Sequence, residues 1–205
     1  MTSSHEFIKK FNKNISSNIK LANYSWFNLG GPAEYLFKPE NKIQLIEFLK
    51  DNRKKKFKIT ILGAGSNTLI RDKGIKGVVI KLGSNFSSIN LIDKETIEVG
   101  AATLDRKISN FAKENGISGF EFLSCIPGTI GGGIRMNAGC FGKEFKDILL
   151  SVQAIDKLGN VITIPAKDIK FQYRKNNLSD DLIFLSASFK GIPGEANKIK
   201  KETER

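Results

Sequence analysis

The fold class is decided by one stretch, Ile126-Pro127-Gly128-Thr129-Ile130-Gly131-Gly132-Gly133-Ile134-Arg135-Met136-Asn137-Ala138-Gly139. Five glycines stand here among apolar neighbours, which indicates a backbone that approaches another group closely. Tight turns around a packed core would also explain them. Because each glycine loses considerable conformational entropy on folding, we favour contact with a ligand. The segment holds no Gly-Lys-Ser/Thr and is therefore not a P-loop.

A second glycine-rich segment, Leu62-Gly63-Ala64-Gly65-Ser66-Asn67, follows a short β-rich run over residues 58–62. Its glycines allow backbone N–H groups to converge on a phosphate, and its Ser and Asn add side-chain donors. An ordinary strand-to-loop turn explains the pattern about equally well. The dinucleotide fingerprint fails, because Thr68 stands at its third glycine position and residues 71–74 predict a turn where a helix is required. A Rossmann fold is therefore disfavoured.

Taken together, the two segments predict more than either does alone. They lie in different halves of the chain, which suggests one long ligand held between two subdomains. A dinucleotide such as FAD fits that demand, since it has a pyrophosphate to cradle and a flat ring to bury.

The remaining pattern predicts an α+β fold, because helices and strands are mixed and the late strands pair locally. Apolar residues at helical spacing predict helices over 41–55, which ends in a basic run, and over 104–112, closed by Gly116. Strands are expected at 58–62, 77–82, 97–101 and 182–189, with a hairpin joining 151–156 to 161–164. Residues 1–20 are expected to be irregular or weakly helical, and residues 195–205 to begin a helix.

The formal net charge is +12, which raises the question of a nucleic-acid partner. Lysine supplies most of the positive charge, whereas arginine is the better bidentate reader of phosphate. Lysine, asparagine, isoleucine and phenylalanine are all enriched, so an A/T-rich genome explains the bias. We therefore expect no nucleic-acid partner, although salt-sensitive binding of DNA or RNA would support one.

Other features indicate where the protein works and which covalent or metal sites it can have. No apolar run approaches the ~18 residues of a membrane helix, and the first residues lack a signal-peptide core, so we expect a cytoplasmic protein without membrane contact. Cys125 and Cys140 form no C-x-x-C pair, and buried free thiols are favoured over a single disulfide. The only histidine, His5, lies in a polar stretch, so a metal site is not expected.

Five sequence segments occur in the same order as in one enzyme family. Together they resemble the UDP-N-acetylenolpyruvoylglucosamine reductases, and the resemblance extends from about Ala22 to Pro193. The five are Asn28-Leu29-Gly30-Gly31-Pro32-Ala33, residues 62–67, Gly119-Phe120-Glu121-Phe122-Leu123-Ser124-Cys125-Ile126-Pro127-Gly128-Thr129-Ile130-Gly131-Gly132, Met136-Asn137-Ala138-Gly139 and Phe171-Gln172-Tyr173-Arg174.

The resemblance implies the two-subdomain FAD-binding fold of the vanillyl-alcohol-oxidase and p-cresol-methylhydroxylase type. It implies subdomains at 1–82 and 83–192, with 193–205 beginning a C-terminal substrate-binding domain. FAD is expected to be noncovalent, because His5 lies outside every motif. The residues implied to contact FAD are Gly63, Ala64, Gly65, Ser66, Asn67, Pro127, Gly128, Thr129, Gly131, Gly132, Asn137, Ala138 and Gly139.

The resemblance also implies a reaction, in which NADPH reduces the enolpyruvyl group of UDP-N-acetylglucosamine enolpyruvate to give UDP-N-acetylmuramate. Arg174 matches the family's catalytic arginine, whose planar fork suits the substrate carboxylate, and Tyr173 is expected to bind substrate beside it. Without the resemblance, a surface salt bridge would be the favoured role of Arg174.

The family's third domain carries a proton-donating serine and an assisting glutamate, and neither segment is found in these 205 residues. Two hypotheses therefore stay open: the reductase itself, and a catalytically incomplete flavin-binding module. We expect a monomer that acts on a small-molecule UDP-sugar.

Overall fold

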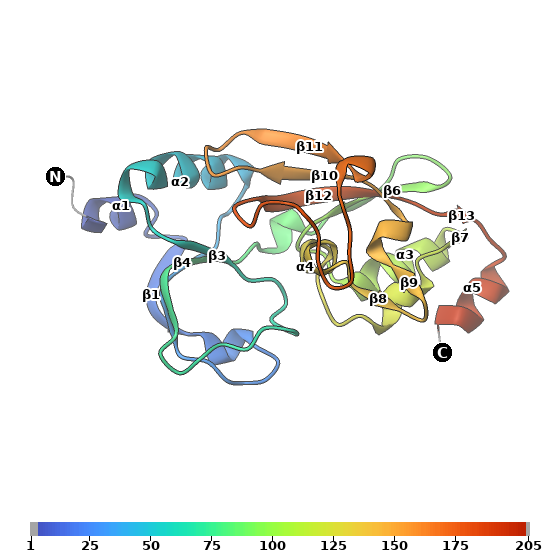
Figure 1. The fold of residues 1–205 in the computed structure, drawn as a ribbon, viewed down its shortest axis with the longest axis horizontal. Coiled ribbons are helices and arrows are strands. Elements are labelled where there is room, and N and C mark those ends of the chain that lie inside the picture. Colours follow the sequence, from blue (N-terminus) through green and yellow to red (C-terminus); the bar gives the residue numbers. More distant parts are fainter. Residues whose placement is uncertain (1–3, 204–205) are drawn as a thin grey trace.

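The computed structural model describes residues 4–203, which two β-sheets organise (Figure 1). The four-stranded sheet uses residues 15–80 and the five-stranded sheet uses residues 89–190. In Figure 1 the first sheet lies at the left, near the N-terminus, and the second reaches across toward the right. No helix among residues 4–203 is long and apolar enough to cross a membrane.

The first sheet has the strand order β1-β2-β4-β3. β4 pairs in parallel with both β2 and β3, whereas β1 is antiparallel to β2. The chain therefore leaves β3 at the carboxyl end of parallel strands, where open α/β sheets bind ligands. The bounds are β1 (Ile15–Lys20), β2 (Pro32–Phe37), β3 (Ile59–Ile61) and β4 (Ile75–Ile80).

Helix α2 (Lys42–Lys55) connects β2 to β3 and packs on this sheet. The Asn41 side chain caps its start by accepting from Gln44 N–H at 2.9 Å. Phe48 on the helix stacks on Phe37 of β2 with ring centroids 4.3 Å apart. Ile155 and Ile183 of the second sheet join the same core, so the two sheets share packed side chains.

The second sheet has the order β11-β10-β12-β6-β5, and all its pairs are antiparallel. β12 is buried on both faces at its start: Phe184, Ala187 and Phe189 pack into one large core, whereas Ile183 and Leu185 pack into the core shared with the first sheet. The bounds are β5 (Ile89–Leu91), β6 (Thr96–Gly100), β10 (Leu149–Ile155), β11 (Val161–Pro165) and β12 (Ile183–Lys190).

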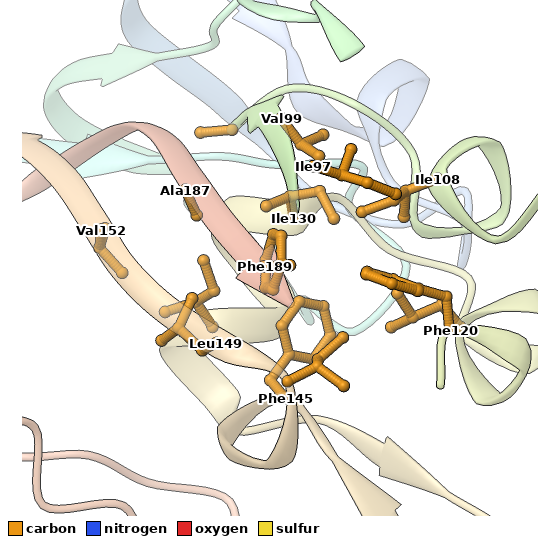
Figure 2. Close-up of a cluster of buried hydrophobic side chains, with 14 of the residues drawn as sticks. Ile97, Val99, Ile108, Phe120, Ile130, Phe145, Leu149, Val152, Ala187 and Phe189 are labelled. Atoms are coloured by element: carbon orange, nitrogen blue, oxygen red, sulfur yellow. The ribbon is translucent and has the colours of Figure 1, made fainter. Parts of the chain in front are cut away.

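Two helices cover that core: α3 (Asp105–Glu114) and α4 (Ile130–Met136). Figure 2 shows Ile108 of α3 and Ile130 of α4 pointing toward Phe189 of β12, with Phe145 beside it. The first residues of α4 are fixed to the turn after β6, because Gly131 N–H donates to the Ala101 carbonyl at 2.9 Å.

The shorter elements complete the chain. They are α1 (Ser4–Lys10), β7 (Ile117–Ser118), β8 (Gly139–Cys140), β9 (Lys143–Glu144), β13 (Ile192–Pro193) and α5 (Ala196–Thr203), with 3₁₀ turns η1 (Leu21–Tyr24), η2 (Ser84–Phe86), η3 (Glu121–Cys125), η4 (Phe145–Asp147) and η5 (Ala166–Asp168). α5 lies against α3 and η3.

The structure confirms the two longer helices, the late hairpin, the four strands and the tail helix through Thr203, each within two residues at its ends. Residues 204–205 of the tail prediction lie outside the described residues. Gly116 follows α3 with φ +66, as a helix-ending glycine does.

Two expectations hold only in part, and one helix was not expected. Residues 1–20 contain a helix, α1, as expected, but they also contain β1, which the polar sequence hides because only its first residue, Ile15, is buried. Residues 130–136 of the glycine-rich stretch form helix α4, which the sequence did not predict. Both cysteines are free as expected, but Cys125 is exposed and Cys140 is only half-buried.

Within α4, Gly133 has a packing role, whereas the sequence favoured ligand contact for the glycines of this stretch. A Cβ there would lie 2.3 Å from the Phe145 ring, so the helix can approach that ring only without a side chain. Next to it, a Cβ on Gly132 would meet nothing closer than the Thr129 hydroxyl at 3.5 Å.

We therefore expect Gly133→Ala to destabilise the fold and Gly132→Ala to leave it unchanged or stabilise it. Overpacking costs about 1–3 kcal/mol, which exceeds the gain of about 1 kcal/mol from helix propensity. Urea unfolding of both variants measures the difference. Adding Phe145→Leu to Gly133→Ala should recover part of the loss, and equal stability of the two single variants would contradict the packing role.

Candidate functional site

The two glycine-rich segments meet in the folded chain. A Cβ added to Gly63 would lie 2.8 Å from the Thr129 hydroxyl, so the loop after β3 touches the turn before α4. Thr129 also bridges to Leu104 at the start of α3. The contact brings the carboxyl end of the first sheet against the helical layer of the second.

A cavity of about 660 Å³, here called the loop cavity, opens where these segments meet. Most of the predicted FAD residues line it: Gly63 to Asn67, Pro127 to Thr129, Gly132 and Ala138. Arg174 reaches it from a distant part of the sequence. The structure thus brings together residues whose sequence separation exceeds 100 positions.

A second cavity of about 450 Å³, the sheet cavity, adjoins the first and shares Gly63, Ala64 and Thr129 with it. It runs along β3 toward Phe184 of β12 and includes Gly131. Its walls are mostly apolar, with Lys81, Arg135 and Asp180 as charged exceptions. Because they share these residues, the two cavities meet at the contact between the glycine-rich segments.

The segment from Gly63 to Asn67 has the properties of an anion cradle. Gly65 adopts φ +72, and a Cβ there would lie 2.0 Å from the Tyr24 carbonyl oxygen. Its own carbonyl accepts from Trp26 N–H at 3.0 Å, which fixes the loop. Within residues 4–203, the N–H groups of 63–67 donate to no protein acceptor, so they are free to bind a phosphate.

Lys81, at the end of β4, lies beside this cradle. Its Nζ donates to the Gly63 carbonyl, and the side chain is half-buried in the wall of the sheet cavity. Burial, assisted by the charge of Lys38, lowers the pKa of the Lys81 ammonium. An anion bound in the cradle would be attracted by the Lys81 ammonium. This attraction would offset the cost of burying that ammonium.

Asn137 and Gly139 do not line the loop cavity. They lie on a smaller neighbouring cavity of about 410 Å³, together with Tyr173 and Arg174. The Asn137 amide donates to the Gln172 carbonyl at 3.3 Å, and its oxygen accepts from the Lys146 N–H. Asn137 therefore connects the end of α4 to the segment that carries Arg174.

Arg174 sits at the tip of a tight turn. Gln172 and Lys175 exchange backbone hydrogen bonds of 2.8 and 3.2 Å across it, and Arg174 adopts φ +56. Its guanidinium lies 5.7 Å from the ring of Tyr173, a residue that is 83% exposed. Among residues 4–203 Arg174 forms no ion pair, so its guanidinium is available to a ligand.

Two residues that sequence reasoning missed hold this region in place. Asn176 is buried and donates to the carbonyls of Ile134 and Arg135 at 2.9 and 3.0 Å. Arg135 donates to the Leu182 carbonyl at 2.9 Å and covers the Phe184 ring at 4.3 Å. No local pattern marks such partners, because each bond spans more than 40 residues of sequence.

The residues present fit FAD. The free N–H groups of 63–67 and Lys81 match a pyrophosphate, and Gly63 and Gly65 stand where a Cβ would collide with Thr129 or Tyr24. Two adjoining cavities with mostly apolar walls, one on each side of the glycine contact, leave room for the two flat ends of a dinucleotide. His, Cys, Asp and Glu form no metal-binding group within residues 4–203.

Comparison with known proteins agrees with this geometry. Residues 33–165, more than half of the chain, match the FAD binding domain family. Over 201 residues the chain is 57% identical to a UDP-N-acetylenolpyruvoylglucosamine reductase of Pelagibacter ubique, and over 179 residues it is 50% identical to one of Rickettsia canadensis. These matches cover 96% and 87% of this chain and 66% and 60% of the relatives, so the chain spans less than two thirds of their length.

Solved structures give the same result. A UDP-N-acetylenolpyruvylglucosamine reductase (MurB) of Thermus caldophilus superposes with a TM-score of 0.80 at 29% identity, over 92% of this chain and 66% of that one. p-Cresol methylhydroxylase superposes with a TM-score of 0.65 at 15% identity, over 93% of this chain and 43% of that one, a likeness of fold alone. The predicted two-subdomain α+β fold is confirmed, and the chain belongs to the FAD binding domain family.

Proposed function

We propose that this chain is the flavin-binding part of a UDP-N-acetylenolpyruvoylglucosamine reductase, which uses NADPH to reduce the enolpyruvyl group of its UDP-sugar substrate to UDP-N-acetylmuramate. The observation that carries the proposal is the loop cavity, where both glycine-rich segments and Arg174 converge. The relatives bearing this name are 50 to 57% identical to the chain. A cytoplasmic monomer without nucleic-acid partners is part of the proposal.

FAD, when bound, supplies a group that accepts a hydride and passes it on. The chain's own residues provide binding and orientation around it. Gly63 to Asn67 would hold the pyrophosphate through N–H groups, Pro127 to Gly132 would border the ring system, and Asn137 to Gly139 would support the neighbouring wall. Enclosure between the sheets would keep water from the reacting atoms.

Arg174 would act on the substrate carboxylate. A guanidinium offers paired donors that match a carboxylate, and negative charge that grows on that side of the substrate during hydride addition would be stabilised by it. Tyr173 would bind substrate at the same turn. The positive charge of Lys81 would serve the cofactor's phosphates, because its Nζ donates to the Gly63 carbonyl beside the cradle.

We expect Arg174→Lys to weaken substrate binding about 10- to 100-fold while leaving FAD affinity within about twofold. Lysine keeps the charge but loses the paired hydrogen bonds, each a charge-assisted contact of about 1.5–3 kcal/mol. The measurement is a titration of the FAD-loaded chain with the enolpyruvyl substrate, followed by flavin absorption. Arg53→Lys, in the last turn of α2, is the matched control.

An anaerobic experiment separates the two hypotheses. Bleaching of the FAD spectrum by NADPH, followed by formation of UDP-N-acetylmuramate, supports the complete reductase. Bleaching without product supports a flavin-binding module that performs one half-reaction. A chain that takes up no FAD contradicts both.

A further inference from the structure

One carboxyl group near the loop cavity has no role in the function proposed above. Asp105, the first residue of α3, is completely buried, and neither of its side-chain oxygens has a hydrogen-bond partner among residues 4–203. Ser109, one turn further along the same helix, is 1% exposed, and within the same described residues its hydroxyl also lacks a partner. Leaving a buried polar group unsatisfied is costly, so two of them at adjacent turns indicate a partner that the protein chain does not supply.

Asp105 borders the loop cavity beneath Gly128. A Cβ on Gly128 would lie 2.6 Å from Asp105 Oδ2, so the carboxyl occupies the space that a side chain at position 128 would need. The backbone is fixed there too, because Asp105 N–H donates to the Gly128 carbonyl at 3.1 Å. Asp105 is among the residues that border the cavity, and its two carboxyl oxygens are buried directly behind the cavity wall.

Structural roles do not account for this carboxyl. It caps no helix, since the N-cap of α3 is Leu104 and no N–H group in the described part of the chain donates to the Asp105 oxygens. It forms no ion pair among residues 4–203. A packing role alone would be better filled by an apolar side chain.

Asp105 is mostly protonated at pH 7 because it is buried. Burial raises the pKa of its carboxyl to about 8, with no charged neighbour as a cause. On the packed elements, Glu121 of η3 is engaged with Ser118 and Gly119, and α5 offers three lysines. Arg106 and Lys107 on α3 are exposed, and Arg135 and Arg174 border the same cavity. A protonated carboxyl presents one O–H donor and one C=O acceptor.

We propose that Asp105 is a ligand contact of the loop cavity, whose carboxyl donates one hydrogen bond to, and accepts one from, a neutral polar group in the flavin half of FAD. A ribityl hydroxyl, or the N–H and carbonyl edge of the ring, has that complementarity. The pyrophosphate does not, because it offers only acceptors and is served by residues 63–67 and Lys81. The inference rests on the proposed FAD site and adds a residue that none of the sequence motifs contains.

The test measures the affinity of the whole chain for FAD between pH 6 and pH 9, by quenching of flavin fluorescence. Wild-type affinity should fall about tenfold over this range, because the ionised carboxyl must regain a proton to bind. Asp105→Asn, which keeps a donor and an acceptor but cannot ionise, should bind within about twofold at every pH. The exposed Asp168→Asn on η5 should keep the wild-type pH profile.

Two further ligands locate the contact. Asp105→Leu should weaken FAD and riboflavin about tenfold or more, and should leave ADP within about twofold. Equal loss for ADP, or no loss for FAD, overturns the proposal. If Asp105→Leu does not fold, the comparison of wild type with Asp105→Asn decides, and identical pH profiles overturn it. Failure of the wild type to bind FAD at any pH overturns the FAD site itself and this contact with it.

Discussion

Replacing Gly65 with alanine is expected to weaken FAD binding at least about 100-fold. The residue adopts φ +72, which costs a side-chain-bearing residue about 1 kcal/mol or more, and the new Cβ would lie 2.0 Å from the Tyr24 carbonyl oxygen. The loop can relieve that collision only by moving, and movement disperses the N–H groups of 63–67. A loss of about 3 kcal/mol corresponds to two powers of ten in affinity.

The matched control for this change is Gly83→Ala. Gly83 has an ordinary backbone conformation, and a Cβ there would meet nothing within 4 Å. FAD titration of both variants, with thermal unfolding of the FAD-free proteins, separates a binding effect from a folding effect. Wild-type FAD affinity in a folded Gly65→Ala protein would contradict the role assigned to this loop.

Asp105→Asn is expected to stabilise the FAD-free chain strongly at neutral pH and much less in acid. The folded-state pKa of this carboxyl is raised from 3.8 to about 8, so folding requires it to hold a proton that the unfolded chain releases. Below pH 3.8 both states are protonated and the penalty vanishes. Between 3.8 and 8 the free energy of unfolding falls by about 1.36 kcal/mol per pH unit, reaching a penalty of about 4 kcal/mol at pH 7.

Urea unfolding at pH 4 and at pH 7 measures this effect in wild type and in Asp105→Asn. The difference between the two pH values removes any constant change caused by the amide. Asp168→Asn, which is exposed, should follow the wild type. An Asn variant whose advantage does not grow between pH 4 and pH 7 would show that Asp105 is not the buried acid described here.

The fold was predictable from the sequence where a segment's own residues determine its structure. The apolar spacing of α2 and its basic end, the hairpin of β10 and β11, and Gly116 after α3 are local signals of this kind. β1 was missed because its residues after Ile15 are mostly polar and its structure comes from pairing with β2. α4 was missed because glycines are poor helix formers, and tertiary contact with Phe145 and Ala101 overrides that preference.

The candidate site was predictable only in part, for the same physical reason. The glycines of 63–65 and 128–132 carry a local signal, since close approach requires a missing side chain. Asp105 carries none, because its burial and lack of partners arise from the meeting of α3 with the turn at Gly128. Asn176 and Arg135 act through carbonyls more than 40 residues away.

The central claim is that the space between the two sheets binds FAD. The measurement that tests it most directly is the absorption spectrum of the purified chain after incubation with FAD and removal of the free cofactor. A yellow protein with one flavin per chain, which is released on denaturation as the expected noncovalent attachment requires, is the predicted result. A colourless, folded chain that retains no flavin would contradict the account.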